Sequence, residues 1–492
     1  MYDPDLHLFV DDDRIHQIIN LRRVLNRPAF TPEPVVQGDA EWELGCGIVA
    51  WGSVIREEDG RLRLWYQLND YPNRQVANAY AESSDGIHWE KPELGLIEWR
   101  GSTRNNLYFR FPDDLAPGNV NAMDGYTMVR DDDAPPAERY AMIAFMHDNR
   151  MWARAHPDQH DRYITDEEIE LASRASGLHL WKSPDGIHFS GAPEFIQPTH
   201  GDYLKVVRDH RNARWMINMR APSYRNPDTG HRHRRNVGLA TSTDLRTWSP
   251  IESLFLNDAD SAFGRLWEWH GLTPFNYGDM DLGFLDIQDS AFPTGICELV
   301  SHRDGQPWRR VAPDRPFLDN GPEGTYYRAG GMPLHNEPIV VNDELLLYFN
   351  TGSSRRPDER PIHPRVIGAA KIRLDRWMSL SHGHWKTREP TGIVVTKPAV
   401  IAGDHLEVNV ETRWESVPRG GSVRVGILDP DGTAIDGYGL DDCEPVQGNH
   451  LRERVRWRDH ADLSALRDRT VMLVFGVEQA SLYSYRLAVR DP

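Results

Sequence analysis

Carboxylate side chains stand at a recurring place in this chain, just before or at the start of short apolar segments. They are Glu43 with its neighbour Glu41, Asp124, Asp202, Asp279, Asp281, and Glu337 with Glu323 shortly before it. Two such groups can share acid–base work, since a protonated carboxyl group donates a proton and an ionised one accepts a proton or acts as a nucleophile. Each acid taken alone can equally cap a turn or face solvent. The chemistry therefore requires a fold that brings acids from distant parts of the sequence together.

A turn pattern indicates which fold this is. An aspartate followed four residues later by Trp or Phe recurs four times, at Asp85/Trp89, Asp185/Phe189, Asp244/Trp248 and Asp304/Trp308. The intervals between these aspartates are 100, 59 and 60 residues, so two intervals agree and the longer one needs an insertion. The carboxylate can close a tight turn by accepting backbone N–H bonds, and the aromatic ring can pack between neighbouring sheets. A period of this kind indicates a β-propeller in which these four aspartates are structural.

Strand-like segments precede each turn in the same order, and a fifth set ends in a variant turn at residues 374–377. Five blades therefore fit within about residues 30–378, and closing the ring protects the strand edges. Residues 8–10 are predicted to supply the outer strand that locks the ring. In such a ring the innermost strands start at a central funnel, where the acids of different blades converge.

Beyond Trp377 the chain changes to short alternating strands joined by turns, which is typical of a β-sandwich. The sequence thus predicts an all-β protein, with a five-bladed β-propeller at residues 1–378 and a C-terminal β-sandwich at residues 379–492. A packing role for the sandwich is favoured over sugar binding, because no exposed aromatic platform is recognisable in it.

Composition excludes several classes of protein. The 492 residues carry a formal net charge of −18, which argues against a nucleic-acid-binding surface. We find no apolar stretch long enough to span a membrane and no secretory signal, and expect no membrane partner. Three scattered cysteines fit neither a disulfide framework nor a zinc site and favour a reducing, cytoplasmic compartment.

The five-bladed pattern, the Ser-x-Asp-Gly-x-x-Trp turns, Trp42-Glu43 at the start of the first blade and the predicted sandwich resemble the glycoside hydrolase superfamily that includes invertases, levansucrases and arabinanases. The resemblance is closest to uncharacterised propeller-plus-sandwich hydrolases that begin with segments like residues 8–12 and 20–25. It spans nearly the whole chain but says little about the substrate, because one scaffold hosts many chemistries. The invertase signature Trp-x-Asn-Asp-Pro-Asn and the Arg-Asp-Pro and Glu-Cys-Pro triplets are absent, so residue roles must be inferred from position.

The resemblance implies that the acids cleave a glycosidic bond, with one carboxyl group protonating the leaving oxygen and a carboxylate serving as nucleophile or base. We predict that Asp202 and Glu43 carry these roles, that Asp124 tunes the pKa of the acid, and that Glu337 belongs to the same set. The predicted substrate-binding residues are Trp42, His200, Tyr203, Tyr277, Asp279, Asp281, His335 and Asn336, while Trp51 either binds sugar or packs in the core. Retention or inversion of configuration stays open.

Two insertions explain the irregular spacing. In residues 147–177, Thr165 followed by Glu168 matches a capping box and predicts a short helix, and residues 151–156 cover the funnel or form a contact in a homo-oligomer. Residues 225–235 include Arg232 and Arg234, which either hold an anionic group of the substrate or form a solvated loop. No histidine spacing fits a catalytic metal, so we expect no cofactor, although a structural Ca²⁺ at an acidic turn stays possible.

These patterns together predict a cytoplasmic, exo-acting glycoside hydrolase whose partner is a small glycoside or oligosaccharide. Two alternatives remain open at this point. One is an inverting glycoside phosphorylase whose basic loop binds phosphate, and the other is a noncatalytic carbohydrate-binding propeller.

Overall fold

The computed structural model of the protein describes residues 1–70, 75–110, 123–146, 165–167, 170, 176–197, 203–221, 236–254, 267–289, 294–313, 315–322, 324–328, 337–351, 365–383, 391–412, 420–460 and 462–489. Strands dominate this part of the chain, so the predicted all-β fold is confirmed. Short 3-10 helices occur at Glu41–Glu43, Pro136–Glu138 and Ser464–Leu466. The helix predicted from Thr165 lies largely outside the described residues, and residues 151–156 lie wholly outside them.

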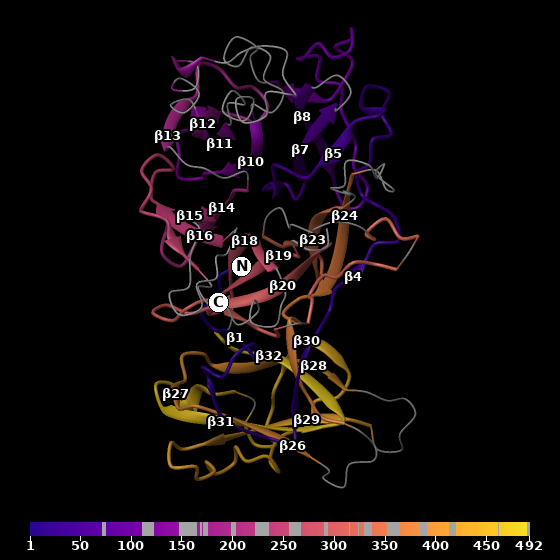
Figure 1. The fold of residues 1–492 in the computed structure, drawn as a ribbon. Helices are drawn as coiled ribbons and strands as arrows, with labels where there is room; N and C mark the ends of the chain where they lie inside the picture. The colour runs from indigo at the N-terminus through magenta and orange to yellow at the C-terminus, as the bar shows by residue number, and fades with distance from the viewer. Residues whose placement is uncertain are drawn as a thin grey trace.

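Five sheets of antiparallel strands follow one another around a common centre in Figure 1, and we number them in chain order. Sheet one holds β5 (Gly47–Val49), β6 (Val54–Arg56), β7 (Leu62–Asp70), β8 (Gln75–Ser83) and β9 (Leu107–Phe109). Sheet two holds β10 (Met123–Arg130), β11 (Tyr140–Met146), β12 (Gly177–Ser183) and β13 (Glu194–Gln197). Sheet three holds β14 (Lys205–Asp209), β15 (Arg214–Ala221), β16 (Asn236–Ser242) and β17 (Glu252–Ser253). Sheet four holds β18 (Trp267–Tyr277), β19 (Met280–Asp289), β20 (Thr294–His302) and β21 (Arg309–Arg310). Sheet five holds β22 (Ile339–Val341), β23 (Glu344–Thr351), β24 (Val366–Arg373) and β4 (Ala29–Phe30).

Hydrogen bonds join every sheet to the next and the fifth back to the first, so the sheets close into a ring. The donors and acceptors, in order around the ring, are Gly52 N to Tyr126 O (2.8 Å), Thr127 Oγ1 to Leu204 O (3.3 Å), His210 N to Asn276 Oδ1 (2.6 Å), Tyr277 Oη to Asp375 Oδ1 (2.8 Å) and Ile48 N to Arg365 O (3.2 Å). A closed ring leaves no inner edge free to pair with another chain.

Three of the four repeated turns form the predicted carboxylate-to-backbone bonds, at Asp85, Asp185 and Asp244, and two of these turns also bind a neighbouring sheet. Asp85 Oδ1 accepts the backbone N–H groups of Ile87 and His88, each at 2.8 Å. Equivalent carboxylate-to-backbone bonds occur at Asp185 and Asp244. The carbonyl group of Gly86 accepts the hydroxyl group of Tyr348 in sheet five, and that of Gly186 accepts the indole N–H of Trp65 in sheet one. The turns therefore fasten neighbouring blades together.

The strand that locks the ring is β4, and the prediction of residues 8–10 for this role is wrong. Ala29 pairs with Lys371 and Phe30 with Ala370 at the outer edge of sheet five. Strand β1 (Leu6–Leu8) instead pairs with β32 (Ala480–Ala488) of the C-terminal unit. Alternation along this strand explains the difference, since Leu6 and Leu8 pack into the core of sheets four and five whereas Phe9 packs into the C-terminal core.

The C-terminal unit consists of two sheets around one core. One sheet has the order β3 (Arg22–Leu25), β25 (Met378–Ser381), β32, β28 (His405–Thr412) and β30 (Asn449–Arg454), with β1 on β32. The other has the order β2 (Ile15–Ile19), β26 (Gly392–Thr396), β31 (Thr470–Glu478) and β27 (Ala399–Val400), with β29 (Ser422–Leu428) on β31. The pairing adds β1, β2 and β3 to this unit, which the division at residue 378 does not include.

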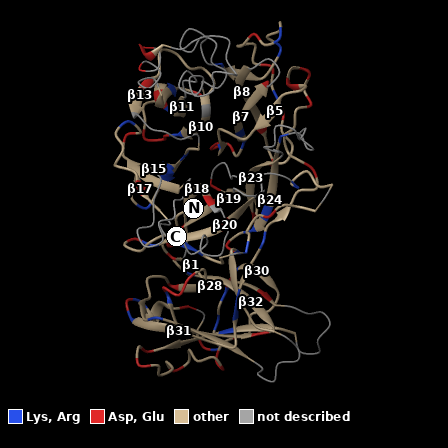
Figure 2. Cartoon of the chain, in the orientation of Figure 1, with Lys and Arg blue, Asp and Glu red and all other residues tan. Residues whose placement is uncertain are grey.

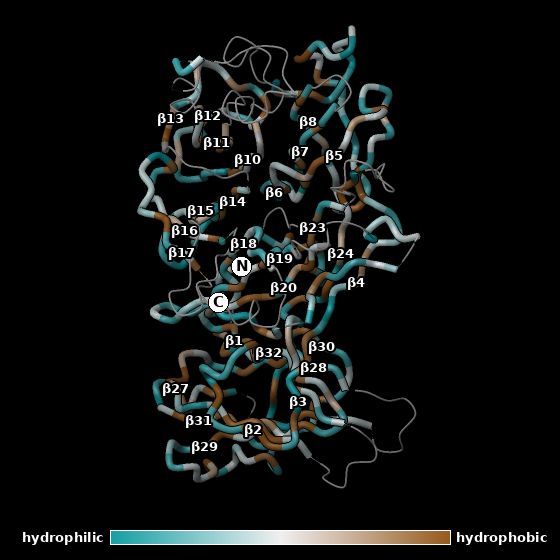
Figure 3. The backbone as a smooth tube through the Cα atoms, in the orientation of Figure 1, coloured by the Kyte–Doolittle hydropathy of each residue, from teal (hydrophilic) through white to brown (hydrophobic). Residues whose placement is uncertain are grey.

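Apolar strands of both units form the cores, as the brown segments of Figure 3 show. Charged residues instead spread over the connecting segments of both units in Figure 2. In the part of the chain that the structure describes, no helix has the length and apolar character needed to cross a membrane.

Candidate functional site

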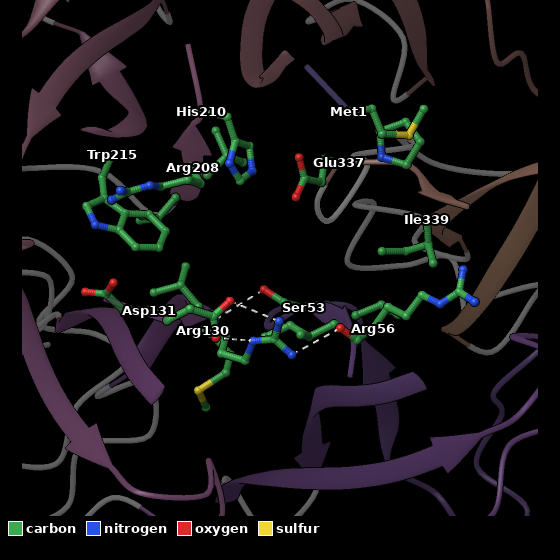
Figure 4. Close-up of a pocket in the computed structure, with 18 of the residues that line it drawn as sticks. Met1, Ser53, Arg56, Arg130, Asp131, Arg208, His210, Trp215, Glu337 and Ile339 are labelled. Atoms are coloured by element: carbon green, nitrogen blue, oxygen red, sulfur yellow. Dashed lines mark hydrogen bonds and ion pairs between the residues drawn. The ribbon is translucent and has the colours of Figure 1, made fainter. Parts of the chain in front are cut away.

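A cavity of about 510 Å³ lies where the innermost strands of four sheets meet. It is lined by residues of β6, β10, β14 and β22 together with the segments that adjoin them. In Figure 4 the carboxylate of Glu337 faces the imidazole of His210 across this cavity. Burial lowers the pKa of His210, and the negative charge of Glu337 partly opposes that effect. The structure thus places Glu337, one of the predicted acids, at a ring cavity.

The arginines of this cavity are already paired. Arg130 forms ion pairs with Glu57 at 2.8 Å and with Asp132 at 2.9 Å. Arg208 forms one with Asp133 at 2.9 Å, and Arg56 donates to the carbonyl group of Val340 at 2.6 Å. Carboxylates thus balance the charges of Arg130 and Arg208, whereas Arg56, which is held by a neutral carbonyl group, keeps its positive charge in the cavity.

A second group of side chains gathers where segments of sheets one, three and four approach one another. We call it the axial cluster, and it consists of Trp51, Tyr203, Lys205, His270 and Asp286. Sheet one supplies Trp51, sheet three supplies Lys205 with Tyr203 directly before it, and sheet four supplies the other two. Side chains from three sheets meet in this way only near the axis of the ring.

A break in the first strand of the ring positions Trp51. Strands β5 and β6 both pair with β7, and residues 50–53 between them leave the ladder. Gly52 has a φ of 112°, and a Cβ atom there would lie 2.3 Å from the carbonyl oxygen of Trp65. The break therefore requires glycine, and it directs the neighbouring Trp51 out of the strand.

A β-bulge positions His270. The pairing of β18 with β19 shifts between Trp269 and Gly271, so His270 has no partner in the ladder. A Cβ atom at Gly271 would lie 2.0 Å from the ring of Tyr203, so glycine is what lets this ring pack against β18. Tyr203 then meets the edge of the His270 ring at a centroid distance of 5.5 Å. Bulges often aim a side chain at a functional site in this way.

Lys205 is the most unusual member of the axial cluster. It is 1% exposed, and among the described residues no hydrogen-bond acceptor reaches its Nζ atom. The nitrogen lies 5.4 Å from the ring centroid of Trp51 and 5.6 Å from that of Tyr203. Burial lowers the pKa of Lys205 to about 7, although the charge of Asp286 opposes the shift. An amine of this kind can change protonation near neutral pH.

His270 and Asp286 form a polar pair beside this lysine. Nδ1 of His270 lies 2.9 Å from Asp286 Oδ2, and since a carboxylate only accepts, Nδ1 carries the proton. Within the described part of the chain, His270 Nε2 and Asp286 Oδ1 have no hydrogen-bond partner. Asp286 is 3% exposed, whereas 13% of the His270 side chain is exposed. Buried polar atoms of this kind need a partner, which a bound ligand or an internal water can supply.

Of the residues named from sequence, Tyr203 and Trp51 lie in the axial cluster, whereas Lys205, His270 and Asp286 were not singled out. The prediction looks for acids at strand starts, and Asp286 lies in the interior of the second strand of sheet four. The sequence did contain one signal that points to Lys205, because this charged residue interrupts the apolar run from Leu204 to Val207.

Glu43 occupies a closed environment instead. Its carboxylate is 0% exposed, accepts a hydrogen bond from the hydroxyl group of Tyr66 at 2.7 Å and forms an ion pair with Lys91. Its neighbour Trp42 is half-buried, and its indole N–H donates to Asn106 at 2.8 Å. These contacts hold the Glu43 carboxylate within the fold, so we do not include it in the proposed site.

Tyr277, Asp279 and Asp281 lie at or beyond the far end of β18 from His270. Tyr277 is seven residues along the strand, roughly 23 Å away at about 3.3 Å per residue. It is 0% exposed and bonds Asp375 of sheet five, and Asp279 pairs with His7, Arg14 and Arg303. Asp281, His302 and Asp304 place atoms that could bind a metal ion within 4.8 Å of one another. The guanidinium group of Arg211, 3.2 Å from Asp281, already balances the charge of this carboxylate. Tyr277, Asp279 and Asp281 thus connect sheet four to other segments of the fold through hydrogen bonds and ion pairs.

The remaining predicted residues are only partly visible. Asp124 is the second residue of β10, and its side chain is not described. Asp202, His200, Arg232, Arg234, His335, Asn336 and Glu323 lie outside the described residues. Asp202 directly precedes Tyr203 in the chain.

No protein-family model and no curated protein matches the chain. Among solved structures it is similar to an N-acetylgalactosamine deacetylase from F. plautii, at 14% identity and a TM-score of 0.39, over 71% of this chain and 96% of that one. It is also similar to a thermostable family-43 glycoside hydrolase (13%, TM-score 0.44, 70% and 96% covered) and to a β-1,2-mannobiose phosphorylase from Listeria innocua (12%, TM-score 0.40, 72% and 97% covered). Likenesses this distant say nothing of substrate, so function must come from the chain's own residues.

Proposed function

We propose that the protein is an enzyme that cleaves a small glycoside at the centre of the ring. The observation that supports this most directly is the axial cluster, in which buried donor and acceptor atoms from sheets three and four stand beside two aromatic rings. Sugars are bound by this combination, because hydroxyl groups need polar partners and the C–H faces of the ring stack on aromatic side chains.

Asp124 and Asp202 are the proposed acid–base pair. Asp124 stands at the start of β10, Asp202 precedes β14, and these neighbouring strands are joined by the hydrogen bond from Thr127 to Leu204. One carboxyl group protonates the leaving oxygen, and the other acts as the nucleophile or activates water. Because the axial cluster is buried, a terminal sugar enters first, which favours an exo mode of action.

Turnover of a panel of nitrophenyl glycosides and small oligosaccharides, measured with and without phosphate, tests this proposal. We expect hydrolysis of at least one substrate, with D124N and D202N each lowering kcat by about 10²- to 10⁴-fold while the unfolding midpoint is unchanged. D59N, at an exposed hairpin tip, is the matched control and should keep full activity. A strict requirement for phosphate would indicate a phosphorylase instead. Sugar binding without turnover of any substrate would indicate a noncatalytic binding protein.

A further inference from the structure

We propose that the axial cluster binds one neutral sugar ring through a pair of neighbouring hydroxyl groups, and that it rejects sugar acids and sugar phosphates. This inference rests on the proposed function and deepens it, since it names the class of substrate. It also makes Lys205, Asp286 and His270 binding residues, although none of them belongs to the predicted acid–base pair.

The hydrogen-bonding capacity of the cluster determines which groups it can bind. An ammonium group only donates, a carboxylate only accepts, and a hydroxyl group does both. Among the described residues, four atoms of the cluster have no hydrogen-bond partner: Lys205 Nζ as a donor, Asp286 Oδ1 and His270 Nε2 as acceptors, and the hydroxyl group of Tyr203, which can do both. A hydroxyl group that accepts from Lys205 can donate to one of these acceptors, and its neighbour on the sugar ring can donate to the other. Two adjacent hydroxyl groups thus satisfy Lys205, Asp286 and His270, and the hydroxyl group of Tyr203 offers one further donor or acceptor to the sugar.

The aromatic side chains supply the apolar part of the site. Trp51 is only half-buried, and the T-shaped contact with Tyr203 at 6.0 Å fixes the plane of its ring. A sugar whose hydroxyl groups reach Lys205 brings its C–H face toward this ring, because the ammonium nitrogen itself lies 5.4 Å from the ring centroid. Trp51 and His270 are the two members of the cluster with exposed surface, so the ligand enters past these two side chains.

The charge balance of the cluster selects a neutral ligand. The positive charge of protonated Lys205 is balanced by the negative charge of Asp286, whose Oδ2 lies 2.9 Å from Nδ1 of His270. Burial raises the pKa of the nearby Cys297 thiol, which is therefore neutral. Glu298 is held by Arg310 through bonds of 2.6 and 2.8 Å. A carboxylate or phosphate placed here would add an unbalanced buried charge beside Asp286.

Isothermal titration calorimetry with the intact protein and free monosaccharides tests the inference without turnover. The probes are glucose, galactose, mannose, fucose and arabinose, the corresponding hexuronates, and the hexose 6-phosphates. We expect at least one neutral sugar to bind, and its charged derivatives to bind at least tenfold more weakly. K205M, D286N and H270Q should each weaken the binding of that sugar at least tenfold. K371M removes a half-exposed lysine on β24 and should bind as the wild type does.

Each other outcome overturns part of the account. Tighter binding of a uronate or phosphate, or unchanged binding by K205M and D286N when both remain folded, overturns the inference. Turnover that does not depend on Lys205 leaves the proposed enzyme standing and removes only the sugar subsite. Cluster-dependent binding of neutral sugars without any turnover keeps the subsite and removes the enzyme. If no sugar binds, the cluster holds only internal water and the inference fails.

Discussion

At the scale of residues, two buried charges in the ring have opposite environments. Glu43 has a cation and a tyrosine hydroxyl group as partners, so its charge is balanced inside the protein. Lys205 is as deeply buried, but no acceptor among the described residues reaches it. The first arrangement stabilises the fold, whereas the second provides an unused donor for a ligand. The sequence analysis gave Glu43 a leading role beside Asp202 because it stands before a strand. Nothing in the local sequence shows that Lys91 covers it.

The structural role of Glu43 predicts a specific pattern in a double-mutant cycle. K91M leaves the carboxylate buried and unpaired, which should lower the free energy of unfolding by about 3–5 kcal/mol. Urea denaturation measures this loss. The double variant E43Q/K91M should recover most of it, because the uncompensated charge is gone. A loss below about 1 kcal/mol for K91M would show that the pair does not hold the fold.

The burial of Lys205 predicts that stability rises with pH. Its pKa is about 7 in the folded protein against a usual 10.5, so between these values the unfolded chain binds more protons than the native one. Stability therefore increases as pH rises through this window, by at most about 1.4 kcal/mol per pH unit. Denaturation of wild type and K205M at pH 6.5, 8 and 9.5 isolates the effect, because the neighbouring Asp286, His270 and Tyr203 are present in both proteins. A difference between the two that is constant with pH would contradict the shifted pKa.

At the scale of elements, the bulge in β18 and the break between β5 and β6 create the site, and the sequence shows neither directly. A bulge depends on the pairing of two strands, so His270 looks like any other strand residue in the sequence. The repeated turns were predictable because each is a local structure, in which one aspartate accepts bonds from residues two and three positions later. Local structure is thus read from sequence more readily than cross-strand geometry.

Gly271 offers a test of this element. G271A places a methyl group 2.0 Å from the ring of Tyr203, so we expect a loss of about 1–3 kcal/mol in unfolding free energy together with weaker sugar binding. G476A in β31 is the matched control, because its nearest contact is an ordinary 3.6 Å. Denaturation and calorimetry provide the two readouts. Full stability and full binding in G271A would mean that Tyr203 does not depend on this close approach.

At the scale of the whole molecule, the N-terminal segment holds the two units together. Strands β1, β2 and β3 pair with C-terminal strands more than 350 residues away, and β4 then closes the ring. Both units were predictable from their strand patterns, but this sharing was not. The apolar residues 8–10 suit burial in either core, and the sequence does not say which edge they pair with.

Phe9 tests this arrangement. It is 2% exposed and meets Phe475 and Tyr485 at centroid distances of 6.1 and 5.8 Å. F9A should therefore lower the unfolding free energy by about 3–5 kcal/mol. V24A, on the same N-terminal segment but at a position 38% exposed, should change it by less than about 0.5 kcal/mol. Equal effects of the two substitutions would contradict a shared core.

The central claim is that the axis of the ring holds a sugar on the axial cluster. A crystal structure of the protein soaked with the best-binding neutral monosaccharide tests it most directly. The account predicts a sugar ring against Trp51, with one hydroxyl group within about 3.2 Å of Lys205 Nζ and a hydroxyl group at the same range from Asp286 Oδ1. A sugar bound only in the cavity between Glu337 and His210, or ordered water alone on those two atoms, would contradict it.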